Sequence, residues 1–137
     1  MKALTLTQPW ATFVAHGIKT IETRSWITSY RGWLAIHAAK GFPQWAQILC
    51  LEKPFDYWLE RLGYTVETLP VGCVIAKAHL VRCVHFTVDY EPPGHEAEFG
   101  NFAIGRYGFI FSAVERFPEP IPAAGALGLW NWEDPRL

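Results

Sequence analysis

Residues 4–40 read LTLTQPWATFVAHGIKTIETRSWITSYRGWLAIHAAK, and this stretch decides how the rest of the 137-residue chain is interpreted. Its first residues, 3–6, have the composition of a short β-strand. A helix should follow, because Thr7 can cap it and Pro9 falls in its first turn, where a missing N–H removes no hydrogen bond. Gly17 is placed to end that helix in a left-handed conformation.

A charged strand is predicted directly after this helix, over residues 20–26. Side chains in a strand alternate between its two faces, so Glu22, Arg24 and Trp26 should share one face. The two charges would then lie roughly 7 Å apart along the strand. Lys19 precedes the strand and completes a compact group of charges.

A second strand is predicted over residues 33–37, after a turn at Gly32. If the two strands paired as antiparallel neighbours, Arg31 or His37 would approach the charged face of residues 20–26. The sequence does not determine the register of such a pair.

The remainder of the chain continues the mixture of strands and helices. Helical spacing of apolar residues occurs at 42–51 and 54–62, and the aromatic residues there, Trp45 among them, are expected to be packing residues and not ligand contacts. Residues 72–83 and 107–115 have the composition and alternation of strands. A loop is expected at 87–105, and the segment 117–128, rich in proline, alanine and glycine, should wrap the domain before Trp130 and Trp132 dock the tail. The predicted fold class is α+β, a small, partly closed β-barrel with flanking α-helices.

Several blocks of the sequence resemble one known family. They are QPWA, GIKTIETRSW and SYRGWLAIHAAK in the first 40 residues, LPVGCVIAKAHLVRC at 69–83, FGNFAIGRYGFIF at 99–111 and PIPAAGALGLWNW at 120–132. These blocks resemble those of the ASCH domains, which are similar in fold to the PUA domains of RNA-modifying enzymes. The resemblance implies a PUA-like barrel, a single ASCH domain over residues 1–137, and binding of RNA.

Composition narrows the function classes. The formal net charge is −1, which argues against general attraction to polyanions. Residues 1–40 nevertheless carry five basic residues against one acidic residue, which favours one cationic mouth on an otherwise acidic body. No apolar run is long enough to cross a bilayer and no signal peptide is apparent, so we expect a soluble, cytoplasmic protein without membrane contact.

Metal and cofactor chemistry receive no support from the sequence. The three cysteines, Cys50, Cys73 and Cys83, form no close pair, and the five histidines lack the spacing of ligands. We therefore expect no metal, no cofactor and buried free thiols. Nucleophile-elbow and phosphate-loop motifs are also absent.

Lys19, Glu22 and Arg24 are the candidate catalytic residues. An ordinary exposed ion-pair cluster is the alternative interpretation, and it would contribute little to stability. In a desolvated cleft, Lys19 could instead be a neutral amine that accepts a proton, or a cation that holds a phosphate or carbonyl oxygen. The sequence leaves these protonation states open.

The candidate ligand-binding residues are Gln8, Trp26, Tyr30, Arg31 and Arg106. Aromatic side chains could stack on a base, a guanidinium could meet a phosphate, and an amide could read a base edge or cap a helix instead. Arg106 could equally anchor a carboxylate such as that of Glu98. Trp10 and Trp33 are assigned to the core.

Three functions follow from these residues and from the resemblance. The first is a domain that binds RNA or a nucleotide. The second is a hydrolase, because the resemblance includes small amidohydrolases that deacetylate acetylated cytidine and members with ribonuclease activity. Gly17, Lys19, Thr20 and Ile21 match the amidohydrolase pattern, but Glu22 occupies the position of the threonine nucleophile, so a carboxylate acting as a general base on water is the remaining mechanism. The third is a protein-interaction domain, which an exposed apolar tail at 127–132 would favour.

Overall fold

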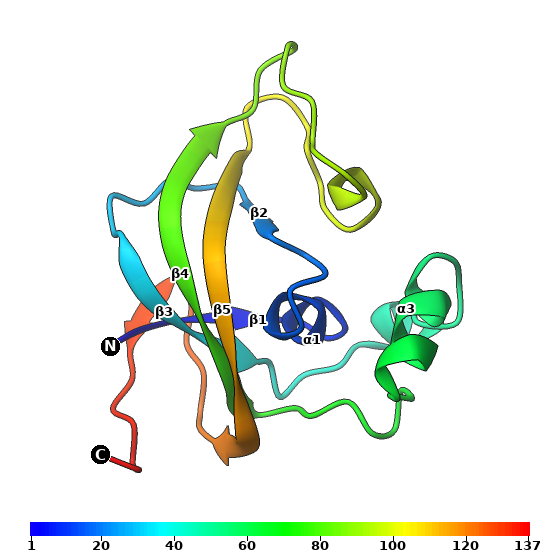
Figure 1. Cartoon of the computed structure of the whole chain (residues 1–137), viewed down its shortest axis with the longest axis vertical. Coiled ribbons are helices and arrows are strands. Elements are labelled where there is room, and N and C mark those ends of the chain that lie inside the picture. The colour runs from blue at the N-terminus through cyan, green and yellow to red at the C-terminus, as the bar shows by residue number, and fades with distance from the viewer.

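The computed structural model describes residues 1–137 and is built on one six-stranded sheet in the order β2-β5-β4-β3-β1-β6. The strands are β1 (Lys2–Leu6), β2 (Ile21–Arg24), β3 (Gly32–Ala38), β4 (Cys73–His85), β5 (Tyr107–Pro122) and β6 (Leu129–Asn131). The helices are α1 (Trp10–Ala15), α2 (Gln44–Leu49) and α3 (Phe55–Leu62), with a short 3-10 turn at Glu96–Glu98. The predicted α+β fold with a PUA-like, partly closed barrel is confirmed (Figure 1).

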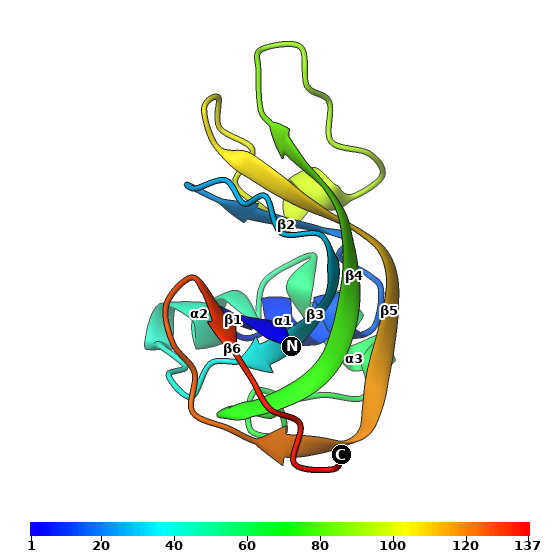
Figure 2. The same ribbon diagram turned by 90° about the vertical axis from the view of Figure 1, so that its left-hand side faces the viewer.

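The two longest strands give the sheet its curvature. β4 and β5 pair as antiparallel neighbours, and their register shifts at three places along the ladder. Each shift bends and twists the pair locally, so the sheet curls into a half-barrel instead of lying flat. Figure 2 shows β4 and β5 curving around α1, which lies inside the curl. Helix and sheet thus enclose one core between them.

Helix α1 ends as the sequence predicts, but it begins differently. Gly17 adopts a positive φ of 73° directly after the helix, a conformation that glycine reaches without steric cost. Thr7, the predicted cap, makes no capping hydrogen bond with its side chain. Gln8 does so instead, because its Oε1 accepts from the Thr12 N–H at 3.1 Å. The side chain of Gln8 is longer than that of Thr7, and it reaches the first turn of α1 although Gln8 lies one position later in the sequence.

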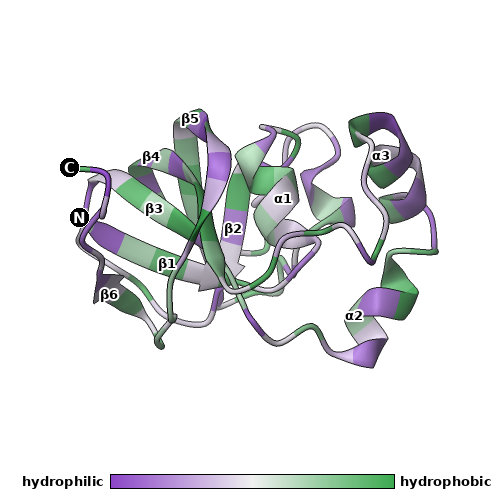
Figure 3. Ribbon diagram, turned by 90° about the horizontal axis from the view of Figure 1, so that it is seen from below, coloured by the Kyte–Doolittle hydropathy of each residue, from purple (hydrophilic) through white to green (hydrophobic).

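Three apolar clusters hold the elements together. The largest fills the curl between α1 and strands β1, β3, β4 and β5, with Leu34, Ile36 and Phe109 fully buried. A second cluster joins α1 to α2, α3 and the 99–101 segment through Phe13 and Phe99. The third lies under Trp132. Figure 3 shows α2 and α3 set apart from the sheet, which explains why they need their own cluster.

One strand pairing that the sequence left open does not occur, and one strand boundary was predicted wrongly. β2 pairs with β5, and β3 pairs with β1 and β4, so the two strands predicted near residues 20–37 are not neighbours. β5 also continues to Pro122, into a segment expected to leave the sheet. Alternation of side chains identifies a strand and its faces, but it contains no information about the partner strand.

The tail docks as predicted. Trp130 lies in β6 and its indole N–H donates to the Thr5 hydroxyl at 3.0 Å, while Trp132 is buried. Leu127 alone in this region is a fully exposed large apolar residue, so the tail offers no continuous apolar face. None of the helices is both long and apolar enough to span a membrane.

All three cysteines are free thiols. Cys50 and Cys73 are buried and Cys83 is partly exposed. Burial raises the pKa of the Cys50 thiol to about 11 and also raises the pKa of Cys73. Both thiols therefore stay protonated near neutral pH and behave as apolar packing groups.

Candidate functional site

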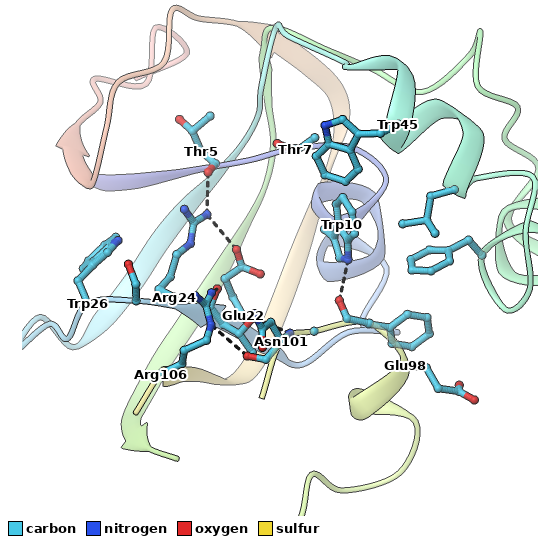
Figure 4. A pocket seen from close by; sticks show the side chains of 16 residues that line it. Thr5, Thr7, Trp10, Glu22, Arg24, Trp26, Trp45, Glu98, Asn101 and Arg106 are labelled. Carbon is cyan, nitrogen blue, oxygen red and sulfur yellow. Dashed lines mark hydrogen bonds and ion pairs between the residues drawn. The ribbon is translucent and has the colours of Figure 1, made fainter. Parts of the chain in front are cut away.

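A cleft of about 720 Å3 opens where the curled sheet fails to close. One margin is the end of β1, and the other is β2. The start of α1, helix α2 and the segment 98–101 complete the walls (Figure 4). The lining residues are Thr5, Thr7, Trp10, Glu22, Thr23, Arg24, Ser25, Trp26, Trp45, Leu49, Phe55, Glu98, Phe99, Gly100, Asn101 and Arg106.

Two linked charges, Glu22 and Arg24, form the floor of the cleft, and a third, Lys19, lies beneath them. Both oxygens of the Glu22 carboxylate are paired, Oε1 with Lys19 Nζ at 3.2 Å and Oε2 with Arg24 Nη2 at 2.9 Å. Lys19 is only 2 % exposed and also donates to the Ile21 carbonyl. It lies behind Glu22 and does not line the cleft. Glu22 and Arg24 are therefore the charges that a ligand would meet, and Lys19 positions Glu22 from below.

Arg24 joins the two margins of the cleft. β6 pairs with β1 only as far as Leu4, so the next carbonyl, that of Thr5, is left to accept from Arg24 Nη2 at 2.8 Å. The same nitrogen holds Glu22. Nε of Arg24 is buried without a hydrogen-bond partner in the protein. An arginine has five N–H donors, and this one uses few of them, so it retains donors for a ligand.

Two tryptophans form one wall of the cleft, opposite Trp26 (Figure 4). The rings of Trp10 and Trp45 are 5.9 Å apart and tilted by 44°. Trp10 is fixed because its indole N–H donates to the Phe99 carbonyl at 2.6 Å. Trp45 is 61 % exposed and has no such anchor. Trp26 packs edge-on against Phe109 at 5.2 Å. The walls are thus aromatic on both sides of the charged floor.

The segment 98–101 is held against β2 by a buried carboxylate. Glu96 accepts from the Thr20 N–H, the Thr20 hydroxyl and the Ile21 N–H at 3.1–3.2 Å. The backbone then approaches β2 so closely that a Cβ on Gly100 would lie 3.0 Å from the Thr23 methyl. The Asn101 N–H donates to the Thr23 hydroxyl at 3.1 Å. This wall is therefore built by local polar contacts.

Arg106 lies at the rim of the cleft. Its Nε donates to the Asn101 carbonyl at 3.2 Å and its Nη2 contacts the Thr23 carbonyl at 3.4 Å. It forms no ion pair with Glu98, whose carboxylate lies 3.4 Å from His95. The alternative role of Arg106 as an anchor for Glu98 is therefore wrong. Its guanidinium is oriented by backbone carbonyls and is not neutralised.

Comparison with known proteins agrees with this architecture. The sequence model of the family described as "ASCH domain" matches residues 4–115 of the chain. The chain belongs to the ASCH domain family. Activating signal cointegrator 1 of Homo sapiens is 38 % identical to this ASCH domain over 86 residues, and the same protein of Mus musculus is 36 % identical. The match covers 59 % of this chain and 14 % of each relative, so the likeness concerns one part of much longer proteins.

The ASCH domain does not bring all of its predicted site residues into the cleft. Glu22, Arg24, Trp26 and Arg106 line it. Gln8 is fully buried, and its amide Nε2 donates to the Pro70 carbonyl at 2.8 Å while its oxygen caps α1. Of the two alternatives considered for Gln8, the structural contact is the one present.

Tyr30 and Arg31 lie outside the cleft of this ASCH domain. The Tyr30 hydroxyl donates to the Trp33 carbonyl, and Arg31 Nη1 donates to the carbonyls of Thr28 and Tyr30 at 2.9 and 2.7 Å. Arg31 is exposed in this loop. The approach of Arg31 depended on pairing between β2 and β3, which does not occur. Both residues stabilise their own turn.

Sequence reasoning missed several residues of the cleft. Trp10 was assigned to the core and Trp45 to packing, yet both line the cleft, as do Glu98 and Asn101. Nothing in the sequence marks Asn101. The two acidic residues Glu22 and Glu98 balance Arg24 and Arg106 among the lining side chains, so the expected cationic mouth is wrong. No group of three or more histidine, cysteine, aspartate or glutamate side chains is arranged to hold a metal ion.

Proposed function

We propose that this ASCH domain binds RNA by taking one unpaired nucleotide into the cleft between Trp45 and Trp26. The observation that carries the proposal is the combination of three tryptophans with two arginines around a cavity of about 720 Å3. Sequence-specific RNA recognition commonly uses splayed bases that stack on aromatic side chains. The family membership supports the same direction, because the ASCH fold resembles that of RNA-associated PUA domains.

Each wall has a separate task in this proposal. A base stacks on the exposed ring of Trp45, which needs no anchor of its own because the fixed Trp10 lies beside it. Arg106 meets a backbone phosphate at the rim, where its guanidinium is open and unpaired with any carboxylate. Arg24, held by Glu22 and Thr5, presents its remaining donors to the base edge. Because Glu22 and Glu98 offset the two arginines among the lining side chains, stacking should contribute more of the affinity for RNA than charge does.

The whole of residues 1–137 acts as one domain in this proposal. The family match ends at residue 115, but β6 pairs with β1 and Trp132 is buried against the sheet. The C-terminal segment therefore belongs to the same half-barrel that carries the cleft. The match to the human and mouse relatives named above covers 59 % of this unit.

Fluorescence anisotropy with short labelled single-stranded RNA tests the proposal. Replacement Trp45→Ala should weaken binding by about 1–3 kcal/mol, the usual contribution of one stacked base. The matched control is Trp33→Ala, because Trp33, like Trp45, makes one aromatic ring contact, with His79, but lies outside the cleft. Equal affinity of the Trp45→Ala variant and the wild type would refute base stacking in the cleft.

Hydrolysis of a modified nucleoside is the second candidate function, and the position of Glu22 favours it. Glu22 lines the cleft and faces Arg24 across 2.9 Å. In an amide hydrolysis of acetylated cytidine, Glu22 would take a proton from water, whose oxygen attacks the acetyl carbonyl. Arg24 would stabilise the oxyanion, and collapse with proton return to nitrogen would release acetate and cytidine. The ribonuclease alternative would use the same groups on a phosphodiester.

Mass spectrometry of acetylated cytidine incubated with the protein distinguishes binding from turnover. Glu22→Gln keeps the shape of the side chain and removes the base, so it should abolish release of acetate while RNA binding persists. Thr20→Ser serves as a control variant that leaves the cleft intact, because Thr20 does not line it. No acetate release by the wild type would eliminate the deacetylation reaction and leave RNA binding as the proposed function.

A further inference from the structure

A second cavity, of about 320 Å3, lies on the other side of α1 from the cleft. Thr12 and Ala15 of α1 and His16 directly after it face this cavity, together with residues from the end of α3 to β4 and residues along β5. It shares no lining residue with the cleft. Its polar side chains are those of Thr12, His16, Tyr64 and Arg116, and none of its lining residues is acidic. We call it the rear cavity.

Arg116 brings a positive charge to the rear cavity that no carboxylate neutralises. It takes part in none of the ion pairs of the protein, although its neighbour Glu115 pairs with Lys77 at 3.2 Å. Its Nη1 instead lies 2.6 Å from Nδ1 of His16 and 3.1 Å from Nε2. A guanidinium that contacts an imidazole and no carboxylate keeps its full charge available.

The contacts of His16 determine which hydrogen-bond donors are available. Arginine can only donate, so Nδ1, the nearer imidazole nitrogen, accepts from Arg116. The proton of a neutral imidazole is then on Nε2, which donates to the Tyr64 hydroxyl oxygen at 3.0 Å. Burial, and next the charge of Arg116, lower the pKa of His16, which is consistent with the neutral form. The Tyr64 hydroxyl proton is therefore free to donate to another group.

Thr12 supplies an independent observation at the same cavity. It is 1 % exposed, the most buried of the lining residues, and its hydroxyl has no hydrogen-bond partner. A buried hydroxyl without a partner loses its hydrogen bonds to water and gains none in exchange. Hydrogen-bond donors without an acceptor thus come to one cavity from three segments of the chain, namely Thr12 in α1, Tyr64 in the loop after α3 and Arg116 in β5.

We propose that the rear cavity is an oxyanion-binding site for a phosphate group, held by Arg116 with the hydroxyls of Tyr64 and Thr12. A phosphate has enough acceptor oxygens to engage all three donors at once, and the absence of lining carboxylates removes the usual competitor for arginine. Leu62, Ile75 and Phe117 add apolar surface beside the buried Thr12 and the half-buried Tyr64, which strengthens hydrogen bonds to their hydroxyls, whereas Arg116 is exposed to solvent.

Inorganic phosphate is the probe, and the His16 ring signals in NMR spectra are the readout. Phosphate should shift these signals in a saturable manner and raise the pKa of His16, because an anion offsets the charge of Arg116. Arg116→Gln should weaken phosphate binding about tenfold or more, as expected for loss of a charged hydrogen-bond donor. Arg106→Gln, at the rim of the cleft, is the matched control and should leave phosphate binding at the rear cavity unchanged.

Tyr64→Phe provides a second variant that keeps the ring and removes only the hydroxyl. It should weaken phosphate binding by several-fold, because one neutral hydrogen bond is lost. The proposal fails if phosphate leaves the His16 signals unchanged, or if Arg116→Gln binds phosphate as tightly as the wild type does. These results are independent of RNA binding in the cleft, which the Trp45→Ala variant reports.

The phosphate group can belong to a free metabolite or to a nucleic-acid backbone. Competition separates the two sources: a nucleoside monophosphate and an oligonucleotide without terminal phosphate are each titrated while the His16 signals are observed. Displacement of inorganic phosphate by the monophosphate alone assigns the site to a small molecule. Displacement by the oligonucleotide assigns it to the backbone, and displacement by neither overturns a biological phosphate ligand.

Discussion

The cleft and the rear cavity lie on either side of α1, and they manage charge in opposite ways. In the cleft, the floor pairs Glu22 with Arg24, and the lining side chains carry equal numbers of acidic and basic groups. In the rear cavity, Arg116 has no carboxylate partner. The first arrangement fixes side chains through ion pairs made within the protein. The second leaves the charge of Arg116 without an ion pair in the protein, so its best partner would be an anionic ligand.

The comparison teaches that total charge is a poor guide to ligand sites in this chain. The net charge of −1 conceals one balanced and one purely cationic cavity. Aromatic surface distinguishes them further, because three tryptophans line the cleft and none lines the rear cavity. Stability, salt and pH should therefore affect the two cavities differently.

The largest difference is expected in stability. Lys19→Met leaves the mostly buried Glu22 without one of its two ion pairs and should lower the free energy of unfolding by about 3–5 kcal/mol. Arg116→Gln removes a surface charge without an ion pair and should change it by less than about 0.5 kcal/mol. Urea denaturation measures both values.

The double variant Lys19→Met with Glu22→Gln is the control for this prediction. It removes both charges together, so it should recover part of the stability lost in the single variant, since the carboxylate that lost its lysine partner is no longer charged. If the Lys19→Met variant is as stable as the wild type, the charges on the cleft floor are not coupled as described.

A moderate difference is expected in the response to salt. RNA held mainly by stacking, with one phosphate at Arg106, should show a log-log salt slope of roughly −0.7. Binding of inorganic phosphate in the rear cavity, which depends on Arg116, should weaken more markedly because other anions compete for the same donors. Anisotropy and NMR titrations over a range of chloride concentrations measure the two effects. A steep slope for RNA would show that phosphate contacts, and not aromatic rings, dominate the cleft.

The smallest effect is expected in the pH dependence of stability. Burial and Arg116 hold the pKa of His16 below its ordinary value of 6.5 in the folded state. At a pH just below 6.5, His16 therefore binds a proton more readily in the unfolded chain than in the folded protein. The free energy of unfolding should decrease as the pH falls through this range, and it should stop decreasing below the folded-state pKa of His16. Arg116→Gln should make the decrease shallower without abolishing it, because burial is the larger cause.

Thermal unfolding of the wild type, Arg116→Gln and His16→Gln at a series of pH values tests this prediction. His16→Gln removes the titrating group and should lose the corresponding part of the slope. No histidine lines the cleft, so variants of the cleft should keep the wild-type slope. An identical slope in the His16→Gln variant and the wild type would contradict the assignment.

Much of the fold was predictable because local rules determined it. Gly17 ends α1, and alternation along residues 20–26 correctly places Glu22 and Arg24 on one face, as their ion pair confirms. The partners of the strands were not predictable, since alternation describes one strand at a time. The length of β5 was also hidden, because its last residues are proline-rich and largely exposed, as an outer strand segment can be.

The candidate site was predictable only where its residues are close together in sequence. Glu22, Arg24 and Trp26 come from one stretch and line the cleft together. Trp45 and Asn101 reach it from α2 and from a loop, through contacts such as the Glu96 bonds to Thr20 and Ile21 that no sequence spacing reveals. Helical spacing suggested that Trp45 packs inward, yet on the short helix α2 only Ala46 is fully buried.

The hydrogen bond from Arg24 to the Thr5 carbonyl holds the two sides of the cleft together. The guanidinium that a ligand would meet also links β2, at one edge of the sheet, to the end of β1 that β6 leaves unpaired. A ligand that only fills the space leaves this link in place, whereas a ligand that draws Arg24 away must supply acceptors for it and for the carboxylate it leaves. A weakly bound ligand therefore cannot break the hydrogen bond between Arg24 and Thr5. Ligand binding in the cleft and the separation of β1 from β2 are coupled through this one side chain.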